Sequence, residues 1–480
     1  EQKTSITIKL TEDQRIMALV LSDTPGGDGS ALKIDIAAGA AHDIAQRDSD
    51  LVNDLAVTET ADTVTPVATS VTLDFNDGTI VISASETIDV RPTGNLLLNK
   101  LTLVNHTGAS GLDAVSLVGA GVQQQESTSI TITLTELQRV TALALSGTPG
   151  GDSSALYLKF EANAIQDMAG NVLSSPQHLL ILETADTTRP AITSATLNYG
   201  TFVLEVTCSE TVDATAASLV DTSKFFLKDV GQSGTTVSLS GAVVTATDGV
   251  TFTMTITEAQ RTAAIVFAGI EGGDGAAVAL NVLEDGLQDI GQNKNLDDED
   301  NAVTETRDSV LPSLQSCTIN YGTGVMTITA DETLDATPSG PNTHLWSFST
   351  YLDPSKIQIS NVAGASVGVG TGVNLAGAAV TNVDGLTVTI TLTELQRVQS
   401  IAMSNTPGGD SGAVVVDFSV GAVRDVGTNQ NAIAMGISMT ETADTILPIV
   451  LAGAIDYGTG ILQINASETI DVTDGALVRL

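Results

Sequence analysis

Hydrophobic and polar residues alternate along most of the chain, in short runs that end at turn-forming residues. The runs TSVTLDF (69–75), TIVISASE (79–86) and SALYLKFEA (154–162) place an apolar residue at every second position. This period of two is typical of strands that bury one face. We therefore predict that the chain is mostly β-structure.

One kind of segment departs from the alternation and has the spacing of a short helix. In TELQRVTALALS (135–146), Thr135 is placed to cap the helix and Gln138 holds the capping-box position. The apolar residues expected on one face of this helix are Leu137, Val140 and Leu143. The paired glycines that follow in TPGGD supply the positive φ angles of a tight turn.

The same pattern recurs four times with fixed internal spacing. Each copy starts at a TExQR segment, whose arginine is Arg15, Arg139, Arg261 or Arg397. Three aspartates follow the arginine: the first 13 residues after it, the second 15 residues after the first, and the third 19 residues after the second. A proline comes next, and the glutamate of an SETxD segment lies 20 residues after that proline. The ETADT-like linker before each proline therefore also recurs four times. A segment repeated in this way is more typical of architecture than of a catalytic site.

About seven strands per ~120 residues, with one short helix before the sixth strand, are typical of an immunoglobulin-type sandwich. We predict an all-β fold of tandem immunoglobulin-like Greek-key β-sandwiches of about 120–136 residues each. The domains that we expect are a partial repeat (C-terminal half) at 1–62, complete repeats at 63–186, 187–308 and 309–444, the last with an insertion near 341–356, and a partial repeat (N-terminal strands) at 445–480.

These segments resemble the immunoglobulin-like repeats of giant microbial surface proteins, that is, adhesins and S-layer-like proteins. The resemblance rests on a proline-led first strand, the SETxD motif that closes the second strand (Glu210, Asp213), VDTSKFFLKD (220–229) and DMAGN (167–171), and it covers the whole chain. It implies an extracellular structural or adhesive role. Because the chain starts and stops inside a repeat, we expect a window of a longer protein. Completion of the terminal repeats by strands of neighbouring chains is the alternative.

Composition narrows the possible partners. The chain has 19 Lys+Arg against 57 Asp+Glu, a formal charge of −38, which repels nucleic acid and anionic membranes. We therefore predict no nucleic-acid partner. No apolar run approaches the ~20 residues of a membrane helix, so we predict no membrane insertion within this window. The two cysteines, Cys208 and Cys317, are expected to be buried free thiols.

The recurrent acids are the candidate metal ligands. In an up-and-down count of strands, the SETxD and DMAGN segments lie at the top of each sandwich, and the helix and the TPGGD turn lie at the bottom. The junction between 63–186 and 187–308 is then expected to gather Asp152, Glu183, Asp186, Glu210, Asp213 and Asp289. The equivalent acids at the other junctions are Asp28, Glu59, Asp62, Glu86, Asp89 and Asp167, then Asp274, Glu305, Asp308, Glu332, Asp335 and Asp425.

Six converging acids repel one another unless they are solvated or share a cation, and calcium is the ion that such oxygen ligands suit. We therefore expect calcium as a ligand of these junctions. The alternative is that the acids solvate turns, cap backbone N–H groups or pair with the TELQR arginine.

Segments that resemble catalytic motifs are better explained as turns. PGGDSGAV (407–414) contains GDSG, as in trypsin-like proteases, but Ser411 holds a variable turn position. A triad also needs a histidine, and none of the four recurs at a fixed place in the repeat: His42, His106, His178 and His344. Carboxylate pairs such as Glu210 and Asp213 occur in every repeat, which favours turn or ion-binding roles over glycosidase chemistry. Asn105 and Asn465 lie in sequons and are possible glycosylation sites.

The sequence thus predicts a non-enzymatic extracellular structural protein that self-associates into a rod, filament or surface appendage. The alternative is a cell-surface adhesin stalk whose variable segments bind a ligand; these segments are 90–125, 214–247 and 336–383. The insertion at 341–356 holds the only tryptophan, Trp346, which is either an exposed contact residue or packed into its own domain.

Overall fold

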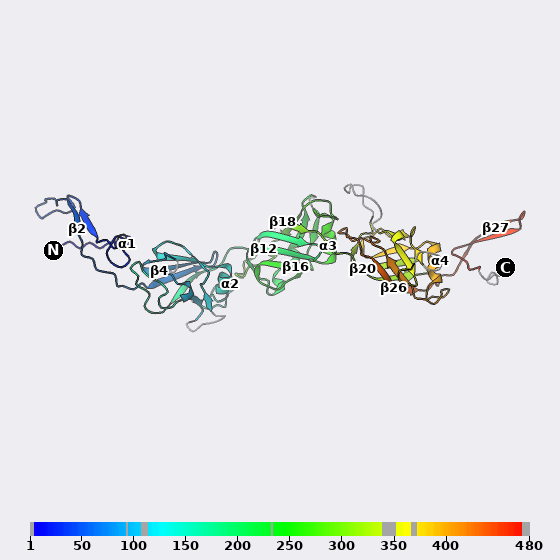
Figure 1. Cartoon of the computed structure of the whole chain (residues 1–480), viewed down its shortest axis with the longest axis horizontal. Coiled ribbons are helices and arrows are strands. Elements are labelled where there is room, and N and C mark those ends of the chain that lie inside the picture. Colours follow the sequence, from blue (N-terminus) through cyan, green and yellow to red (C-terminus); the bar gives the residue numbers. More distant parts are fainter. Residues whose placement is uncertain are drawn as a thin grey trace.

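The chain forms three β-sandwiches that lie end to end in one elongated row (Figure 1). A computed structural model describes residues 4–92, 95–106, 114–231, 234–337, 352–365 and 372–472. A segment with α1 (Glu12–Val20), β1 (Lys33–Ile36) and β2 (Val52–Ala56) precedes the first sandwich. A hairpin of β27 (Val450–Asp456) and β28 (Ile461–Ala466) follows the third.

The described residues of sandwich 1 form one α-helix and eight strands, in the order β6-β5-β9-β10-β3-β4-β8-β7. In chain order these elements are β3 (Ala68–Asp74), β4 (Thr79–Ile88), β5 (Leu101–Val104), β6 (Ala114–Ser116), β7 (Gly121–Val122), β8 (Ser127–Thr133), α2 (Glu136–Ala144), β9 (Tyr157–Phe160) and β10 (Gln177–Thr184). A 3₁₀ turn, η2 (Leu98–Lys100), leads into β5.

Two features of the strand pairing give the immunoglobulin-like arrangement. The first half of β10 pairs antiparallel with β9, and its second half pairs parallel with β3, so β10 belongs to both layers. The short strands β6 and β7 pair with β5 and β8 respectively, again one in each layer. If β6 and β7 are counted together as one strand that crosses between the layers, the sandwich has seven strands and α2 lies directly before the sixth, β9. The predicted fold class is therefore confirmed.

Sandwiches 2 and 3 repeat the same order of elements. Sandwich 2 contains β11 (Ile192–Asn198), β12 (Val203–Val212), η4 (Ala217–Leu219), η5 (Thr222–Lys224), β13 (Phe225–Asp229), β14 (Thr236–Ser238), β15 (Val243–Val244), β16 (Gly249–Thr255), α3 (Glu258–Ile265), β17 (Val278–Val282) and β18 (Asp298–Thr306). Sandwich 3 contains β19 (Leu314–Asn320), β20 (Val325–Leu334), η6 (Pro354–Lys356), β21 (Ile357–Ser360), β22 (Val373–Asn374), β23 (Ala379–Val380), β24 (Gly385–Thr391), α4 (Glu394–Ala402), β25 (Val415–Phe418) and β26 (Ala434–Thr442).

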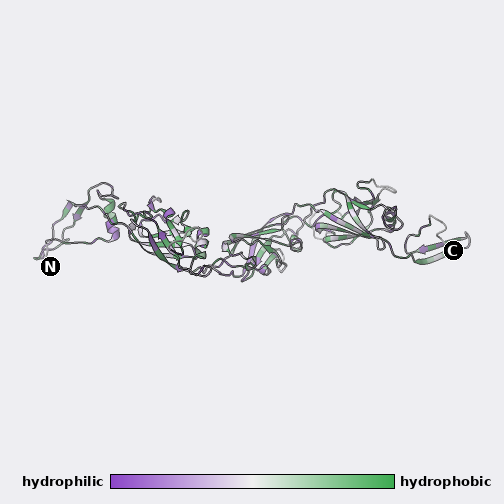
Figure 2. Ribbon diagram, turned by 90° about the horizontal axis from the view of Figure 1, so that it is seen from below, coloured by the Kyte–Doolittle hydropathy of each residue, from purple (hydrophilic) through white to green (hydrophobic). Residues whose placement is uncertain are grey.

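Each sandwich has its own hydrophobic core, made mainly of Val, Leu, Ile and Ala. The cores extend from Ala68 to Ile181, from Ile192 to Val303 and from Leu314 to Met439. Figure 2 shows hydrophobic residues on the strands of all three sandwiches. Cys208 and Cys317 are buried free thiols, as predicted.

The helix α2 confirms the predicted capping box but only part of the predicted buried face. The hydroxyl of Thr135 accepts from the N–H of Gln138, and the Gln138 side chain accepts from the N–H of Thr135. The buried residues are Gln138, Arg139, Ala142 and Leu143, whereas Leu137 is 78% exposed. Leu143 is buried and Val140 half-buried as expected, so the prediction was wrong only for Leu137. Its place on the buried face is taken by Gln138, whose amide donates to backbone carbonyls of the β6–β7 turn, and by Arg139, which is buried at the end of the sandwich.

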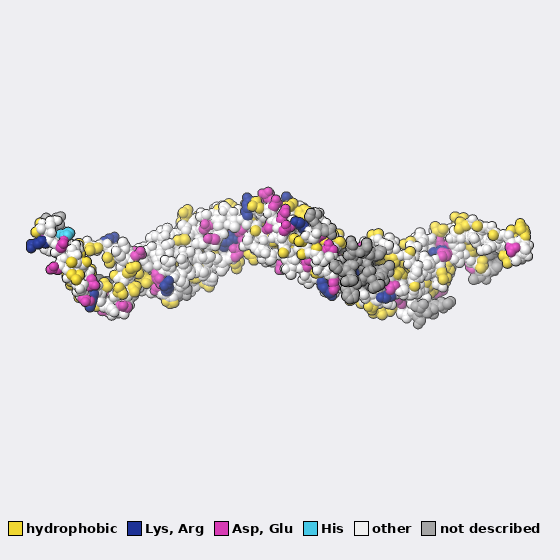
Figure 3. All heavy atoms as spheres, turned by 90° about the horizontal axis from the view of Figure 1, so that it is seen from above, with side chains coloured by type: hydrophobic (Ala, Val, Ile, Leu, Met, Phe, Trp, Pro, Cys, Tyr) yellow, Lys and Arg dark blue, Asp and Glu magenta, His cyan; other side chains and the backbone are white. Residues whose placement is uncertain are grey.

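Acidic side chains are spread along the molecule rather than gathered in one patch, as the face shown in Figure 3 illustrates. Among the residues that the structure describes, no helix has the length and apolar composition needed to cross a membrane.

Candidate functional site

The candidate functional sites are the four junctions between consecutive parts of the row, each of which is built around one arginine. We number them along the chain: junction 1 has Arg15, junction 2 has Arg139, junction 3 has Arg261 and junction 4 has Arg397. Junctions 2 and 3 connect complete sandwiches.

At junction 2, Arg139 connects both sandwiches and the linker. Its Nε and Nη2 donate to the two carboxylate oxygens of Glu136, one helical turn earlier, at 2.7 and 2.8 Å. Its Nη1 donates to the carbonyl of Phe75 at 2.9 Å and to Asp186 Oδ2 in the linker at 2.6 Å. Its Nη2 also donates to Glu210 Oε2, at the end of β12 in sandwich 2, at 3.1 Å.

All five N–H donors of the Arg139 guanidinium therefore have an acceptor. The planar group has a fixed geometry, and bonds between ionised partners are stronger than neutral ones. A rotation of one sandwich against the other would break several of these bonds together.

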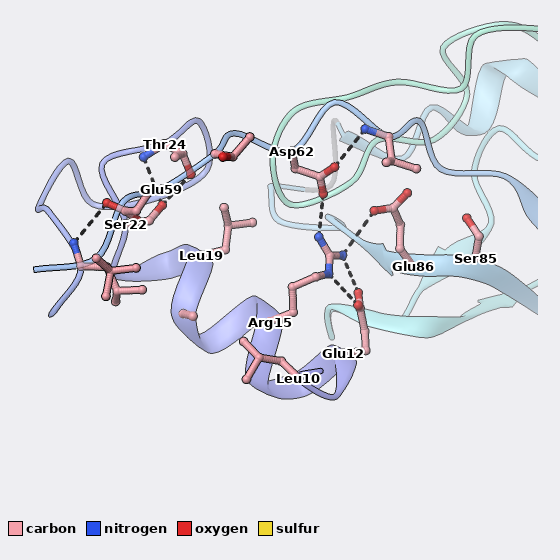
Figure 4. Close-up of a pocket in the computed structure, with 15 residues that line it drawn as sticks. Leu10, Glu12, Arg15, Leu19, Ser22, Thr24, Glu59, Asp62, Ser85 and Glu86 are labelled. Carbon is pink, nitrogen blue, oxygen red and sulfur yellow. Dashed lines mark hydrogen bonds and ion pairs between the residues drawn. The ribbon is translucent and has the colours of Figure 1, made fainter. Parts of the chain in front are cut away.

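The arginine–carboxylate bonds of this network recur at the other junctions with nearly the same distances. The equivalent residues are Arg15, Asp62 and Glu86 at junction 1, Arg261, Asp308 and Glu332 at junction 3, and Arg397, Asp444 and Glu468 at junction 4. In that order, the distance from the arginine to the linker aspartate is 2.6, 2.5 and 2.6 Å, and the distance to the strand glutamate is 3.3, 3.2 and 3.2 Å. Figure 4 shows junction 1, where Arg15 on α1 points between Glu12, Asp62 and Glu86.

The helix glutamate makes a second bond across each junction. At junction 2, the N–H of Thr211 donates to Glu136 Oε1 at 2.9 Å, so a side chain of sandwich 1 caps the strand end of sandwich 2. The equivalent N–H groups of Thr87, Thr333 and Thr469 donate at 2.8, 2.7 and 2.8 Å. Each junction thus has a charged and a backbone connection.

Apolar contact completes the two inner junctions. Ile290, in the loop before β18, packs against the core of sandwich 1, and Val426 packs in the same way against the core of sandwich 2. The glycine turn after the helix lies against this loop. Gly150 has φ +89°, and a Cβ there would lie 2.0 Å from the Ile290 carbonyl oxygen; at Gly272 (φ +97°) a Cβ would lie 2.4 Å from the Val426 oxygen. These positions require glycine for close approach as well as for the turn.

Three of the six acids expected at each junction come together. The triads are Asp62, Glu86 and Asp167 at junction 1, Asp186, Glu210 and Asp289 at junction 2, and Asp308, Glu332 and Asp425 at junction 3. In each triad one carboxylate oxygen from each residue lies within 4.8 Å of the others. The three residues come from the linker, the end of the second strand and the loop before the last strand.

The members of a triad differ in their partners. At junction 2, Asp289 accepts from the backbone and side-chain nitrogens of Asn293, and Asp186 accepts from Arg139 and from the N–H of Thr188. Glu210 accepts through Oε2 alone, and its buried Oε1 has no hydrogen-bond donor among the described residues.

Burial, together with the neighbouring carboxylates, makes ionisation of the triads unfavourable. Burial and then the Asp289 charge raise the pKa of Glu210 to about 8, and burial raises the pKa of Asp289 to about 6. At the other junctions the same causes raise the pKa of Glu332 to about 8, of Asp425 to about 6 and of Glu86 to about 7. The arginine lowers these values but does not compensate for the burial.

The remaining predicted acids have partners within their own sandwich or segment. Asp152 is exposed and accepts from Asn105 and the N–H of Ser154, Glu183 accepts from the N–H of Gly147, and Asp213 accepts from Gln288. Their equivalents behave alike: Asp28 with Ser30, Asp274 with Ala276, Glu59 with Leu32, Glu305 with Gly269 and Tyr199, Asp89 with Asn95, and Asp335 with Arg424. The structure therefore does not bring these nine acids into the triads.

The other predicted sites fall in turns, on strands or outside the described residues. Ser411 has φ +70° and donates its N–H to the Ser404 carbonyl, as Ser153 (φ +69°) does to Ser146, so both are turn residues. Asn105 is half-buried and donates to Asp152, and Asn465 lies on β28. Trp346 and most of the insertion at 341–356 lie outside the described residues.

The sequence indicates the arginine only as an alternative partner of the acids. It does not identify the helix glutamate, Ile290 or the contact at Gly150 as parts of the junction. The available signal was the TExQR spacing, because Glu136 and Arg139 at i and i+3 share one helix face.

Comparisons with known proteins give no family. No protein-family profile and no curated protein matches the chain. Among solved structures, the chain is similar to the S-layer protein rSbsC (8% identity, TM-score 0.18, 86% of this chain and 59% of that one) and to the titin domains Z1Z2 in complex with telethonin (11%, 0.13, 51% and 99%). It is also similar to SGBP-B of the Bacteroides ovatus mixed-linkage glucan utilization locus (12%, 0.14, 84% and 72%). The chain thus spans only 59% of the S-layer protein's length, and at these scores none of the likenesses bears on function.

Proposed function

We propose that this chain is a non-enzymatic, extracellular structural protein whose tandem sandwiches form a rod, filament or surface appendage. The observation that carries the proposal is the recurrence of one arginine–carboxylate network at all four junctions. Tandem units with the same interface at every step build a quasi-one-dimensional object. The domain boundaries given above are part of this proposal.

Surface properties support the extracellular and self-associating parts of the proposal. A charge of −38 spread along the row keeps the chain soluble and suits a salt-rich medium. Apolar side chains are exposed at both ends of the row, for example Ile8 at 76% and Leu451 at 66%. Such side chains favour contact with further copies of the same fold.

Calcium is a second and separable part of the proposal. The triads at junctions 1 to 3 provide hard oxygen ligands, and an ion there would stiffen the rod. The rod part of the proposal rests on the arginine network and the apolar contacts, not on the ion.

The alternative function, an adhesin stalk with ligand-binding variable segments, stays a prediction. Trp346 and most of the insertion at 341–356, on which it depends most, lie outside the described residues, and no observation on the described part of the chain favours it.

Electron microscopy of the 480-residue chain tests the proposal. We expect elongated particles of uniform shape that associate as concentration increases. Particles bent at random angles at the junctions would contradict the rod. Particles that remain single at high concentration but bind cells or glycans would support the adhesin instead.

A further inference from the structure

The strongest unexplained feature of the junctions is one carboxylate oxygen at the same place in each. Oε1 of Glu86, Glu210, Glu332 and Glu468 is buried and has no hydrogen-bond donor among the described residues. Within the three triads the residue itself is only 6, 6 and 5% exposed (Glu86, Glu210 and Glu332). Leaving a buried acceptor without a partner costs free energy, more so when it is charged.

The charges around this oxygen are unbalanced. At junction 2, one guanidinium lies among Glu136, Asp186, Glu210 and Asp289, so four carboxyl groups share a single cationic partner. The guanidinium has no further N–H to offer, because all five of its donors are used within the network. The described protein groups at this place therefore offer neither a second cation nor a further N–H donor to Glu210 Oε1.

We propose that each triad binds one calcium ion, with the free Oε1 of Glu86, Glu210 or Glu332 as the ligand that no protein group satisfies. The inference rests on the junction role proposed above and names its ligand. Linker, strand end and loop each supply one carboxylate, so the ion holds three segments that meet at the interface.

The size of the triad suits calcium. Calcium–oxygen distances are about 2.3–2.6 Å, so two ligands on opposite sides of the ion are about 4.6–5.2 Å apart. The three oxygens all lie within 4.8 Å of one another, so one ion can contact all three. Magnesium keeps several of its waters and usually takes only one or two carboxylates, so three carboxylates at one place favour calcium. Water completes the coordination shell in either case.

Junction 4 provides an internal comparison. Asp444 and Glu468 form ion pairs with Arg397, as their equivalents do at the other junctions, but the described residues supply no third carboxylate there. The chain is therefore expected to take up about three ions, and the two at the buried junctions 2 and 3 should bind more tightly than the one at junction 1.

Calorimetric titration of the chelator-treated 480-residue chain with CaCl₂ tests this inference. We expect a stoichiometry of about three, reduced by one in Glu210→Gln and by two in Glu210→Gln with Glu332→Gln. MgCl₂ should bind at least tenfold more weakly. The matched controls are Asp152→Asn and Asp274→Asn, acids of the glycine turns outside the triads, which should leave the stoichiometry unchanged.

Two results would overturn the inference: no binding of calcium at millimolar concentration, or binding that the double variant leaves unchanged. Far-UV circular dichroism checks that the variants are folded, and Asp289→Asn provides a second variant of the same triad. Small-angle scattering of the wild type in chelator separates this inference from the proposed function. A straight particle without calcium binding would keep the rod and reject the ion, whereas a flexible particle with or without calcium would reject the rod.

Discussion

Junctions 3 and 1 contain the same bonds but differ in burial. Arg261 and its partner Asp308 have side chains that are 0 and 1% exposed, whereas Arg15 and Asp62 are 34 and 14% exposed. Junction 3 lies between two complete sandwiches, and junction 1 has only the N-terminal segment on one side. The helix, the linker and the strand end therefore determine the bonds, and complete neighbours determine how far the bonds are removed from water.

Burial changes what each network contributes. Removing one partner of a buried ion pair leaves an uncompensated charge, whereas exposed pairs contribute little. The comparison therefore predicts that equivalent substitutions have unequal effects along the row.

The largest effect is expected from Arg261→Met at junction 3. The substitution leaves Asp308 and Glu332 buried without their cation, which we expect to destabilise the interface by about 3–5 kcal/mol. Hydrogen exchange at the backbone N–H of Thr333, which bonds to Glu258 across the junction, measures this. Unchanged protection of Thr333 would show that the network does not hold the junction.

A smaller effect is expected from Gly272→Ala, compared with Gly275→Ala in the same turn. Both glycines have positive φ, +97 and +88°, so both substitutions carry the left-handed backbone penalty of about 1–2 kcal/mol. Only at Gly272 would the new Cβ meet a backbone atom, the Val426 carbonyl oxygen, whereas nothing lies within 4 Å at Gly275. Gly272→Ala should therefore lower the melting temperature more than Gly275→Ala. If both substitutions lowered the melting temperature equally, Gly272 would be needed only for the turn and not for its contact with Val426.

The pH dependence of junction 3 in chelator is a further test. Burial and the Asp425 charge raise the pKa of Glu332 to about 8, above its ordinary value of 4.5. A group with a raised folded-state pKa stabilises fully below its unfolded pKa, and this contribution is lost as the pH rises through the folded value. The pKa of Glu258 is shifted the other way, because its bond to Arg261 lowers it below 4.5. Glu258 therefore loses its stabilising contribution only at pH values below that of the decline expected from Glu332.

Thermal stability in chelator should therefore decline between about pH 5 and pH 8. Glu332→Gln should flatten that decline. A stability that rises over the same interval in the wild type would show that the carboxylates remain ionised there without penalty.

The smallest effect is expected from Arg15→Met at junction 1. With about a third of the arginine side chain exposed, water replaces the lost bonds, and we expect a loss of at most about 1 kcal/mol. Hydrogen exchange at the N–H of Thr87 is the matching measurement. If Arg15→Met destabilised junction 1 as much as Arg261→Met destabilises junction 3, burial would not be what distinguishes the two junctions.

The fold class could be predicted because its signals are local. Alternation identifies the strands, and the Thr135–Gln138 box identifies the helix start, independently of the rest of the chain. The buried face of the helix could not be predicted in this way. Arg139 is buried because acceptors from the linker and the next sandwich surround it, and these lie 47 and 71 residues away.

The position of the candidate site could be predicted from the sequence, but not which of the acids form the triad. Counting strands correctly puts Asp186, Glu210 and Asp289 at one junction, since it depends only on chain direction. It cannot show that Asp152 turns toward Asn105 or that Glu183 caps Gly147, because loop geometry decides where those side chains point.

The most direct test of the account is the distance distribution between spin labels on sandwiches 2 and 3. Labels at Ser194→Cys and Ser316→Cys, both exposed, require Cys208→Ala and Cys317→Ala, and alanine is already present at the equivalent positions Ala84 and Ala195. A rigid junction predicts one narrow distance distribution, which broadens when Arg261→Met is added. A broad distribution that Arg261→Met leaves unchanged would contradict the claim that the arginine networks make this chain a rod.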